Sequence, residues 1–426
     1  MDSKRKVMSQ IRHLVKQYFD RQSIEDANTD SRRMPLIAPS YGWQEVVEAI
    51  DSMLSTQVTM GSKVKQFESM FAEYIGKSEA IMVNSGSSAN LLAISLLTNP
   101  AFRNRIKPGD EVITPAVTWA TTVYPIINCG LVPVLVDVSL ETFDIDVKEI
   151  QKAINPRTRA ILLVHLLGNP CDMDSIMEIS EKYKLFVIED ACEAHGAEYK
   201  GMKVGSFGHI STFSFYFSHH ITTIEGGMVL TDDEEIAELA RSLRVFGWIR
   251  DLKEKDRFAA AHADIDPRYL FTNIGYNFRP TEIQGAFGIH QMRKLEELIK
   301  IRRENARFLT QNLKEFGDFF ILHEERENTR HAWFGYPLTV KAKAPFTRKQ
   351  IVTFLEKRGV ETRPIMCGNI DEQPVMRLFP YRKIGELTNS RFIMRNSFFF
   401  GNHQAITRAK REALVEYLKE FTSELS

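Results

Sequence analysis

The chain has 426 residues, of which 43% are hydrophobic and 26% are charged, and its 55 basic residues balance its 55 acidic ones. This length exceeds the size at which one hydrophobic core usually stops growing, so we expect a large and a small domain. This balance of charge argues against a protein that binds nucleic acid or an anionic membrane surface. Any anion that the protein binds must be held by local groups.

The N-terminal sequence, the apolar runs and the cysteines give no indication of export, membrane insertion or a metal site. The N-terminus MDSKRKVMSQ lacks the apolar centre of a signal peptide, and no apolar run approaches the roughly 18 residues of a membrane span. We therefore expect a cytoplasmic protein. The four cysteines, Cys129, Cys171, Cys192 and Cys367, are scattered. They fit neither a zinc site nor a disulfide framework, so no bound metal is predicted.

The first part of the chain predicts an arm followed by an α/β domain. Apolar residues recur at helical spacing from Val7 to Phe19, which predicts a helical N-terminal arm over residues 1–34. From about Tyr41, helix-like segments alternate with short apolar runs, several apolar on both faces as buried parallel strands should be. These runs are EAIMVNSG, DEVITPAV, LVPVLVDV, TRAILLVH, KLFVIEDA and GHISTFSF. They predict a large doubly wound domain with a mostly parallel sheet over residues 35–295.

The pattern changes after Gly275. A long charged helix is expected from Pro280 to about Phe316, then a strand at WFGYPLTV, a helix at TRKQIVTFLEKRG and a final helix from Thr407. These elements predict a smaller C-terminal α/β domain over residues 296–426.

Three segments place polar or aromatic residues where parallel strands end and ligands gather. In VNSGSSANLL, Gly86 permits a tight turn and Ser87 opens a helix, whose free N–H groups could cradle a phosphate. A merely capped loop is the alternative. Asp190 ends an apolar strand and could hold a pyridinium nitrogen protonated, or could cap a helix. Trp119 follows another strand and could stack on a flat ring, or belong to the core.

A fourth segment, STFSFYFSHHITTIEGGMVLTDD, resembles the lysine segment of the DegT/DnrJ/EryC1/StrS sugar aminotransferases, which are fold-type I pyridoxal-phosphate enzymes. A second resemblance is carried by GYNFRPTEIQGAFG, from Gly275. The agreement in order and spacing extends from about Pro35 to the C-terminal helix. His219 stands at the position of the family's lysine, and His220 follows it.

The resemblance implies a role for seven further residues. The cofactor phosphate would be held by Gly86, Ser87 and Ser214, with Asn277 of the partner subunit of a homodimer. The ring would be stacked by Trp119, paired at its nitrogen with Asp190, and approached at its hydroxyl by Glu193. The aminotransferases usually have glutamine at the position of Glu193, so this residue departs from the family pattern.

The HHIT segment that begins at His219 resembles the corresponding segment in one branch of the family. That branch removes the 3-hydroxyl of nucleotide-linked 4-keto-6-deoxy sugars. Because histidine cannot form the lysine's covalent bond to the cofactor, we expect pyridoxal phosphate and pyridoxamine phosphate to bind reversibly, with L-glutamate restoring the amine form. Imidazole, with an ordinary pKa of about 6.5, suits proton transfer near neutral pH, so His219 is the expected catalytic residue. The neighbouring His220 should point elsewhere and be structural.

Other interpretations remain open. In part of this branch an iron–sulfur cluster is bound by cysteines after the lysine-equivalent segment. No cysteine lies between Glu193 and Met366 here, so no iron–sulfur cluster is expected. The chain could instead be an aminotransferase that recruits another lysine, such as Lys200 or Lys203, or a catalytically silent partner subunit. The sequence does not choose between GDP, CDP and dTDP as the nucleotide.

Overall fold

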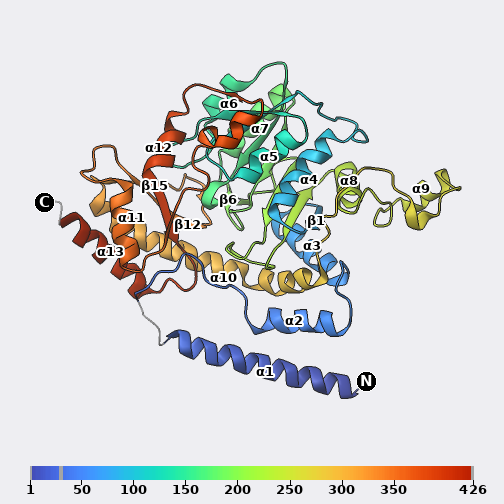
Figure 1. Ribbon diagram of the computed structural model, residues 1–426, viewed down its shortest axis with the longest axis horizontal. Coiled ribbons are helices and arrows are strands. Elements are labelled where there is room, and N and C mark those ends of the chain that lie inside the picture. Colours follow the sequence, from blue (N-terminus) through green and yellow to red (C-terminus); the bar gives the residue numbers. More distant parts are fainter. Residues whose placement is uncertain (1, 28–31, 424–426) are drawn as a thin grey trace.

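An eight-stranded, mostly parallel sheet organises the larger part of the chain (Figure 1). The computed structural model describes residues 2–27 and 32–423. Within them the strand order is β1-β9-β8-β5-β4-β2-β3-β14, and only β9 runs antiparallel to its neighbours. The strands are β1 (Glu79–Val83), β2 (Glu111–Pro115), β3 (Val132–Val136), β4 (Thr158–Val164), β5 (Phe186–Asp190), β8 (Ile210–Ser214), β9 (Gly227–Thr231) and β14 (Arg382–Lys383). The predicted α/β fold is confirmed, and each of the six apolar runs contains a strand.

Helices cover both faces of this sheet, as alternating side chains require. In β1, Ile81 and Val83 pack in the core under α4 (Gly86–Thr98) and α8 (Glu234–Arg244). Met82 points to the other face and packs against α3 (Ser62–Ile75) and α10 (Glu282–Leu313). The helices α6 (Val147–Ala153) and α7 (Met173–Tyr183) continue that face, and α5 (Ala120–Asn128) packs beside α4. The sheet is therefore doubly wound.

The C-terminal part is built around a second, antiparallel sheet of order β10-β12-β15-β13. Its strands are β10 (Phe320–Leu322), β12 (Gly335–Val340), β15 (Ser397–Gly401) and β13 (Thr362–Pro364), and α11 (Arg348–Lys357), α12 (Thr388–Asn396) and α13 (Arg408–Ser423) accompany them. The long helix α10 connects this part to the large sheet (Figure 1). The domain boundary that we placed between residues 295 and 296 falls inside α10, and it stays a prediction.

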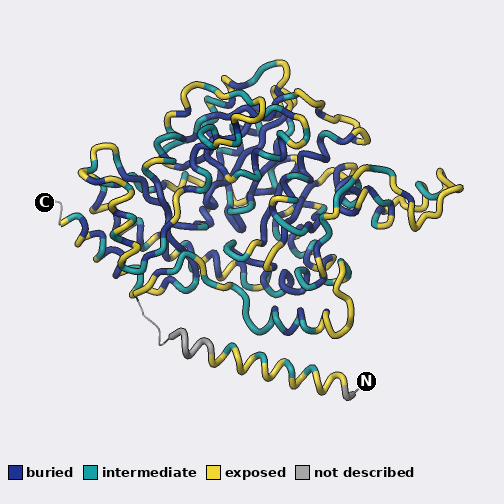
Figure 2. Tube along the Cα trace, viewed as in Figure 1, coloured by how far each residue is buried: buried dark blue, intermediate teal, exposed yellow. Residues whose placement is uncertain are grey.

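Two features project from this body. The helix α1 (Asp2–Ala27) lies beside α2 (Trp43–Leu54), and much of its described surface is exposed (Figures 1 and 2). The predicted arm is thus helical, although residues 1 and 28–31 lie outside the described part. The short helix α9 (Lys255–Ala261) projects at the right edge of the view in Figure 1. A small separate sheet joins β6 (Glu198–Tyr199), β7 (Met202–Lys203) and β11 (Thr329–Arg330). Within the described ranges, no helix combines the length and apolar character needed to span a membrane.

Candidate active site

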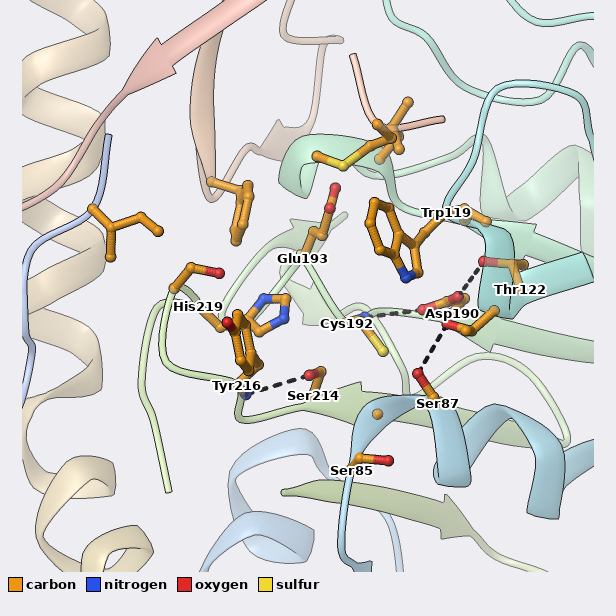
Figure 3. Close-up of a pocket in the computed structure, with 18 of the residues that line it drawn as sticks. Ser85, Ser87, Trp119, Thr122, Asp190, Cys192, Glu193, Ser214, Tyr216 and His219 are labelled. Atoms are coloured by element: carbon orange, nitrogen blue, oxygen red, sulfur yellow. Dashed lines mark hydrogen bonds between the residues drawn. The ribbon is translucent and has the colours of Figure 1, made fainter. Parts of the chain in front are cut away.

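A pocket of about 430 Å³ opens where the parallel strands of the large sheet end (Figure 3). Its walls come from the loops after β1, β2, β4, β5 and β8, and from residues of the C-terminal part such as Phe334, Met366 and Phe399. Seven of the eight predicted site residues line it: Gly86, Ser87, Trp119, Asp190, Glu193, Ser214 and His219. Residues far apart in sequence therefore meet as expected.

The floor of the pocket is the N-terminus of α4. Ser85 caps the helix and accepts a hydrogen bond from the Ser88 backbone N–H at 3.1 Å. Gly86 lies so close to β8 that a Cβ at this position would come within 2.5 Å of the Ser214 Cβ, so only glycine fits. The Ser87 hydroxyl lies 3.2 Å from that of Thr121. The backbone N–H groups at the start of α4 and the hydroxyls of Ser87, Thr121 and Ser214 thus surround a space that suits a phosphate group.

Asp190 is held rigidly at the end of β5. Its Oδ2 accepts hydrogen bonds from Asn90 Nδ2 and Thr122 Oγ1, both at 2.8 Å, and its Oδ1 accepts one from the Cys192 backbone N–H at 3.2 Å. The side chain is buried, yet it reaches the pocket wall. Three donors on one carboxylate fix its orientation and favour an acceptor for a cationic ring N–H.

Trp119 lies across the pocket from the serines (Figure 3). It is the residue immediately before α5, and its side chain is 53% exposed, so it is a wall residue and does not belong to the core. A large flat side chain left half in solvent beside a pocket is available to stack on an aromatic ligand.

Glu193 is the second carboxyl group of the pocket. Its Oε2 accepts a hydrogen bond from the Leu167 backbone N–H at 2.9 Å. Burial, together with the nearby Asp190 carboxylate, raises the pKa of Glu193 to about 8, so this side chain is neutral at pH 7. A protonated glutamic acid carries one O–H donor and one carbonyl acceptor, as the side-chain amide of glutamine carries a donor and an acceptor. The departure from the family's glutamine is therefore chemically small.

His219 stands on the wall opposite Trp119, beside Tyr216 (Figure 3). Its ring packs against Phe334 at a centroid distance of 5.2 Å, and its Nδ1 is buried without a hydrogen-bond partner. Burial and the nearby Arg302 cation lower the pKa of His219 to about 3. The imidazole is therefore neutral at physiological pH, and Nε2 is the nitrogen left to exchange a proton with the pocket.

The remaining candidates lie outside the pocket. His220 is fully buried, its Nε2 lies 3.1 Å from the Ala332 carbonyl oxygen, and it does not line the pocket, although its ring contacts Phe334 as that of His219 does. Asn277 is exposed, and its Oδ1 accepts a hydrogen bond from Arg279. Lys200 pairs with Asp174 and Lys203 with Glu198 and Glu296. Among the pocket residues of the described chain there is no lysine.

Several pocket residues were missed by sequence reasoning. Asn90 and Thr122 orient Asp190 from two different helices, and Arg302 and His403 come from the C-terminal part. The sequence places Asn90 at the start of the helix that follows Gly86, but nothing in it indicates the hydrogen bond to Asp190. Arg302 lies within the charged helix α10, where only its position on the buried face distinguishes it from neighbouring arginines. In the described residues, no three His, Cys, Asp or Glu side chains form a group that could hold a metal ion.

A sequence profile of the DegT/DnrJ/EryC1/StrS aminotransferase family matches residues 41–419. The chain belongs to this family. It is 40% identical over 395 residues to the GDP-4-keto-6-deoxy-D-mannose 3-dehydratase of Yersinia pseudotuberculosis, covering 91% of this chain and 98% of the relative. It is 39% identical over 391 residues to the dTDP-4-dehydro-2,6-dideoxy-D-glucose 3-dehydratase of Saccharopolyspora spinosa, covering 89% and 84%.

Two solved structures are similar along almost their whole length. The E. coli GDP-4-keto-6-deoxy-D-mannose-3-dehydratase with bound hydrated PLP superimposes with a TM-score of 0.84 at 37% identity, over 91% of this chain and 98% of that one. A GDP-4-keto-6-deoxymannose-3-dehydratase with a trapped PLP-glutamate geminal diamine gives a TM-score of 0.83 at 36% identity, over 90% of this chain and 100% of that one. The aminotransferase-like fold is thereby established for this chain.

Proposed function

We propose that the chain is a 3-dehydratase that uses pyridoxal and pyridoxamine phosphate to remove the 3-hydroxyl of a nucleotide-linked 4-keto-6-deoxy sugar, with L-glutamate as the amino donor. The observation that carries the proposal is the identity of one wall residue. By the resemblance of its sequence segment, His219 corresponds to the family's lysine, and no lysine of the described chain lines the pocket. A pocket built for this cofactor without a lysine favours reversible binding and acid–base chemistry.

The residues present fit the cofactor. The N–H groups at the start of α4, with Ser87 and Ser214, would hold its phosphate, and the absence of a side chain at Gly86 leaves the necessary space. Asp190, oriented by three donors, would pair with the ring nitrogen, and Trp119 would cover one face of the ring. When bound, the cofactor supplies an electron sink that allows a proton and the sugar hydroxyl to leave.

Glu193 would complete the ring contacts as a neutral group. With its Oε2 accepting the Leu167 N–H, the protonated Oε1 can donate a hydrogen bond toward the ring hydroxyl. An ionised carboxylate at the same position would repel a phenolate oxygen. The raised pKa of Glu193 thus lets a glutamate serve where the aminotransferases use glutamine.

His219 would carry the proton. Because its pKa is lowered, the free imidazole is in the base form, and Nε2 can accept a proton from the carbon beside the cofactor ring. The same nitrogen can then deliver that proton to the departing 3-hydroxyl. The contacts of the ring with Phe334 and Tyr216 would hold it in place for both transfers.

The relatives support this assignment but leave the nucleotide open. Two that match most of the chain are named 3-dehydratases, one for a GDP sugar and one for a dTDP sugar. Solved dehydratases of the same fold contain PLP or a PLP-glutamate adduct. A homodimer in which Asn277 of the partner subunit reaches the phosphate remains part of the proposal, since Asn277 is exposed and outside its own pocket.

The main alternative is a nucleotide-sugar aminotransferase, because the family also contains enzymes such as the GDP-perosamine synthase of Caulobacter vibrioides, 35% identical over 338 residues. The ion-paired positions of Lys200 and Lys203 count against a substitute lysine. A silent subunit is the other alternative. It need not bind the cofactor, so a cofactor titration separates it from an enzyme.

The test is to incubate the purified protein with pyridoxal phosphate, L-glutamate and a panel of 4-keto nucleotide sugars. We expect mass spectrometry to show the loss of one oxygen from one sugar. One 2-oxoglutarate and one ammonia should accumulate per deoxygenated sugar, since glutamate supplies the two electrons, water supplies the keto oxygen of 2-oxoglutarate, and the sugar 3-hydroxyl leaves as water. An aminated sugar in place of the deoxygenated one, or a requirement for a flavin reductase and NADH, would overturn the proposal.

A further inference from the structure

A buried arginine without a counter-ion borders the active-site pocket. Arg302 lies on α10, is only 5% exposed, and lines the pocket together with His219. Its Nη1 donates hydrogen bonds to the backbone carbonyl oxygens of Phe334 at 2.8 Å, Trp333 at 3.4 Å and Asn402. These acceptors are neutral. Over residues 2–27 and 32–423 no carboxylate pairs with Arg302, and its Nε has no hydrogen-bond partner.

The guanidinium remains a cation in spite of its surroundings. Burial lowers its pKa to about 9, which is still above neutral pH. Arginine is rarely buried without a paired anion, because the fold then bears the full cost of desolvating the charge. The three backbone carbonyls all accept from Nη1, and Nε has no hydrogen-bond partner. An anion from the pocket is therefore the missing partner.

The position of Arg302 discriminates between the anions that the pocket would receive. A cofactor phosphate already has a site at the N-terminus of α4, beside Ser87 and Ser214. Arg302 instead lies near His219, because Phe334, whose carbonyl accepts from Arg302, packs on the His219 ring. That ring marks the reacting centre. The diphosphate of a nucleotide sugar is separated from the reacting sugar carbon by several bonds, which places it farther out.

The amino donor carries an anion in the required place. In L-glutamate, the α-carboxylate and the reacting amine are attached to the same carbon, so a carboxylate must lie next to the reacting centre. We propose that Arg302 binds the α-carboxylate of the amino donor. The Nε and Nη2 edge of a guanidinium matches the two oxygens of a carboxylate. This proposal rests on the proposed function only through its donor half, in which glutamate converts the cofactor to its amine form.

The experiment compares Arg302→Met and Arg302→Lys with a matched control, Arg303→Met. Arg303 is the next residue on the same helix, but it pairs with Glu325 and the His331 carbonyl and does not line the pocket. Calorimetry on the cofactor-free proteins measures L-glutamate binding without any reaction. A single-turnover assay on the cofactor-loaded proteins follows conversion of pyridoxal to pyridoxamine phosphate as glutamate is varied, and binding of the nucleotide sugar is measured separately.

We expect Arg302→Met to weaken glutamate binding roughly 10- to 100-fold in both assays, as for loss of a charged hydrogen-bond pair, while affinity for the nucleotide sugar changes little. Arg302→Lys should recover part of the loss because it keeps the charge. Arg303→Met should resemble the unaltered protein. Equal glutamate affinity in Arg302→Met and Arg303→Met, or a loss confined to the nucleotide sugar, would overturn the proposal.

A second measurement needs no variant, so the proposal stays testable if Arg302→Met does not fold. L-glutamine keeps the α-carboxylate and blocks the γ-carboxylate, whereas the α-amide of glutamate does the reverse. L-glutamine should displace glutamate from the unaltered protein, and the α-amide should bind at least 10-fold more weakly. Equal binding of the two amides would refute the role of Arg302. Failure of dehydration alone would leave this result standing, because the donor half-reaction is measured without the sugar.

Discussion

The neutral state of Glu193 predicts a specific dependence of stability on pH. In the unfolded chain its carboxyl releases a proton near the ordinary pKa of 4.5, whereas in the folded chain burial keeps it protonated up to about pH 8. Between these values only the folded state binds the proton, so stability falls as pH rises. Glu193→Gln removes the titrating group, and its amide can still accept the Leu167 N–H and face the pocket with a donor.

The size of the effect follows from the two pKa values. Taken at face value, the difference corresponds to up to about 5 kcal/mol at pH 8, and relaxation and water entry around a half-buried side chain reduce it to about 1 to 3 kcal/mol. Glu193→Gln should therefore match the parent protein near pH 5 and exceed its stability by about 1 to 3 kcal/mol at pH 8. Urea unfolding of the cofactor-free proteins across this range measures the difference.

A control substitution separates this effect from a general one. Glu178 is exposed on α7, so Glu178→Gln should leave the pH dependence unchanged. At pH 7 the Glu193→Gln protein should also keep its turnover within a few-fold, since both side chains offer a donor and an acceptor. If Glu193→Gln and the parent lose stability in parallel from pH 5 to pH 8, Glu193 is ionised in the folded protein and the glutamine-like role is wrong.

Three further predictions concern the cofactor, the base and the assembly. Pyridoxal phosphate should be removed by dialysis and should not be fixed by borohydride; a full-stoichiometry adduct on any lysine would contradict this. His219→Asn should bind the cofactor but lose about 10²- to 10⁴-fold in dehydration rate, because the phosphate and ring contacts lie on other residues; near-normal turnover would contradict it. The active unit should sediment as a dimer or larger, and a fully active monomer would remove Asn277 from the site.

The strands that carry the site could be predicted because the sequence states their environment locally. The β4 and β5 segments are mostly buried and apolar, and the β5 run ends at a polar residue, Asp190, that reaches the pocket. The tight turn at Gly86 could also be predicted locally, because a glycine follows an apolar run there. The reason why only glycine fits at this position could not be predicted, because the side chain that excludes a Cβ belongs to Ser214, on a strand far along the chain.

The residues that tune the chemistry were harder to find, because their effect depends on what the fold leaves unpaired. Nothing local distinguishes Arg302 from Arg303, yet one borders the pocket without a counter-ion and the other has Glu325. The same holds for Glu193, which would be an ordinary surface carboxylate if Leu167 and the pocket wall did not enclose it. The charge state of these side chains depends on tertiary packing, so sequence motifs alone do not predict it.

Under the proposed function, these charges would allow a histidine to act in place of the lysine in this pocket. A base must be neutral before it can take a proton, and the uncompensated Arg302 cation, with burial, favours the neutral form of His219. If the donor carboxylate binds Arg302, it neutralises that cation at the moment when His219 must accept a proton, so donor binding would raise the basicity of the imidazole. The charge of Arg302 would then have two effects: it would position the amino donor and it would change the basicity of the His219 imidazole. Such coupling requires the two side chains to share a wall of the pocket, as they do here.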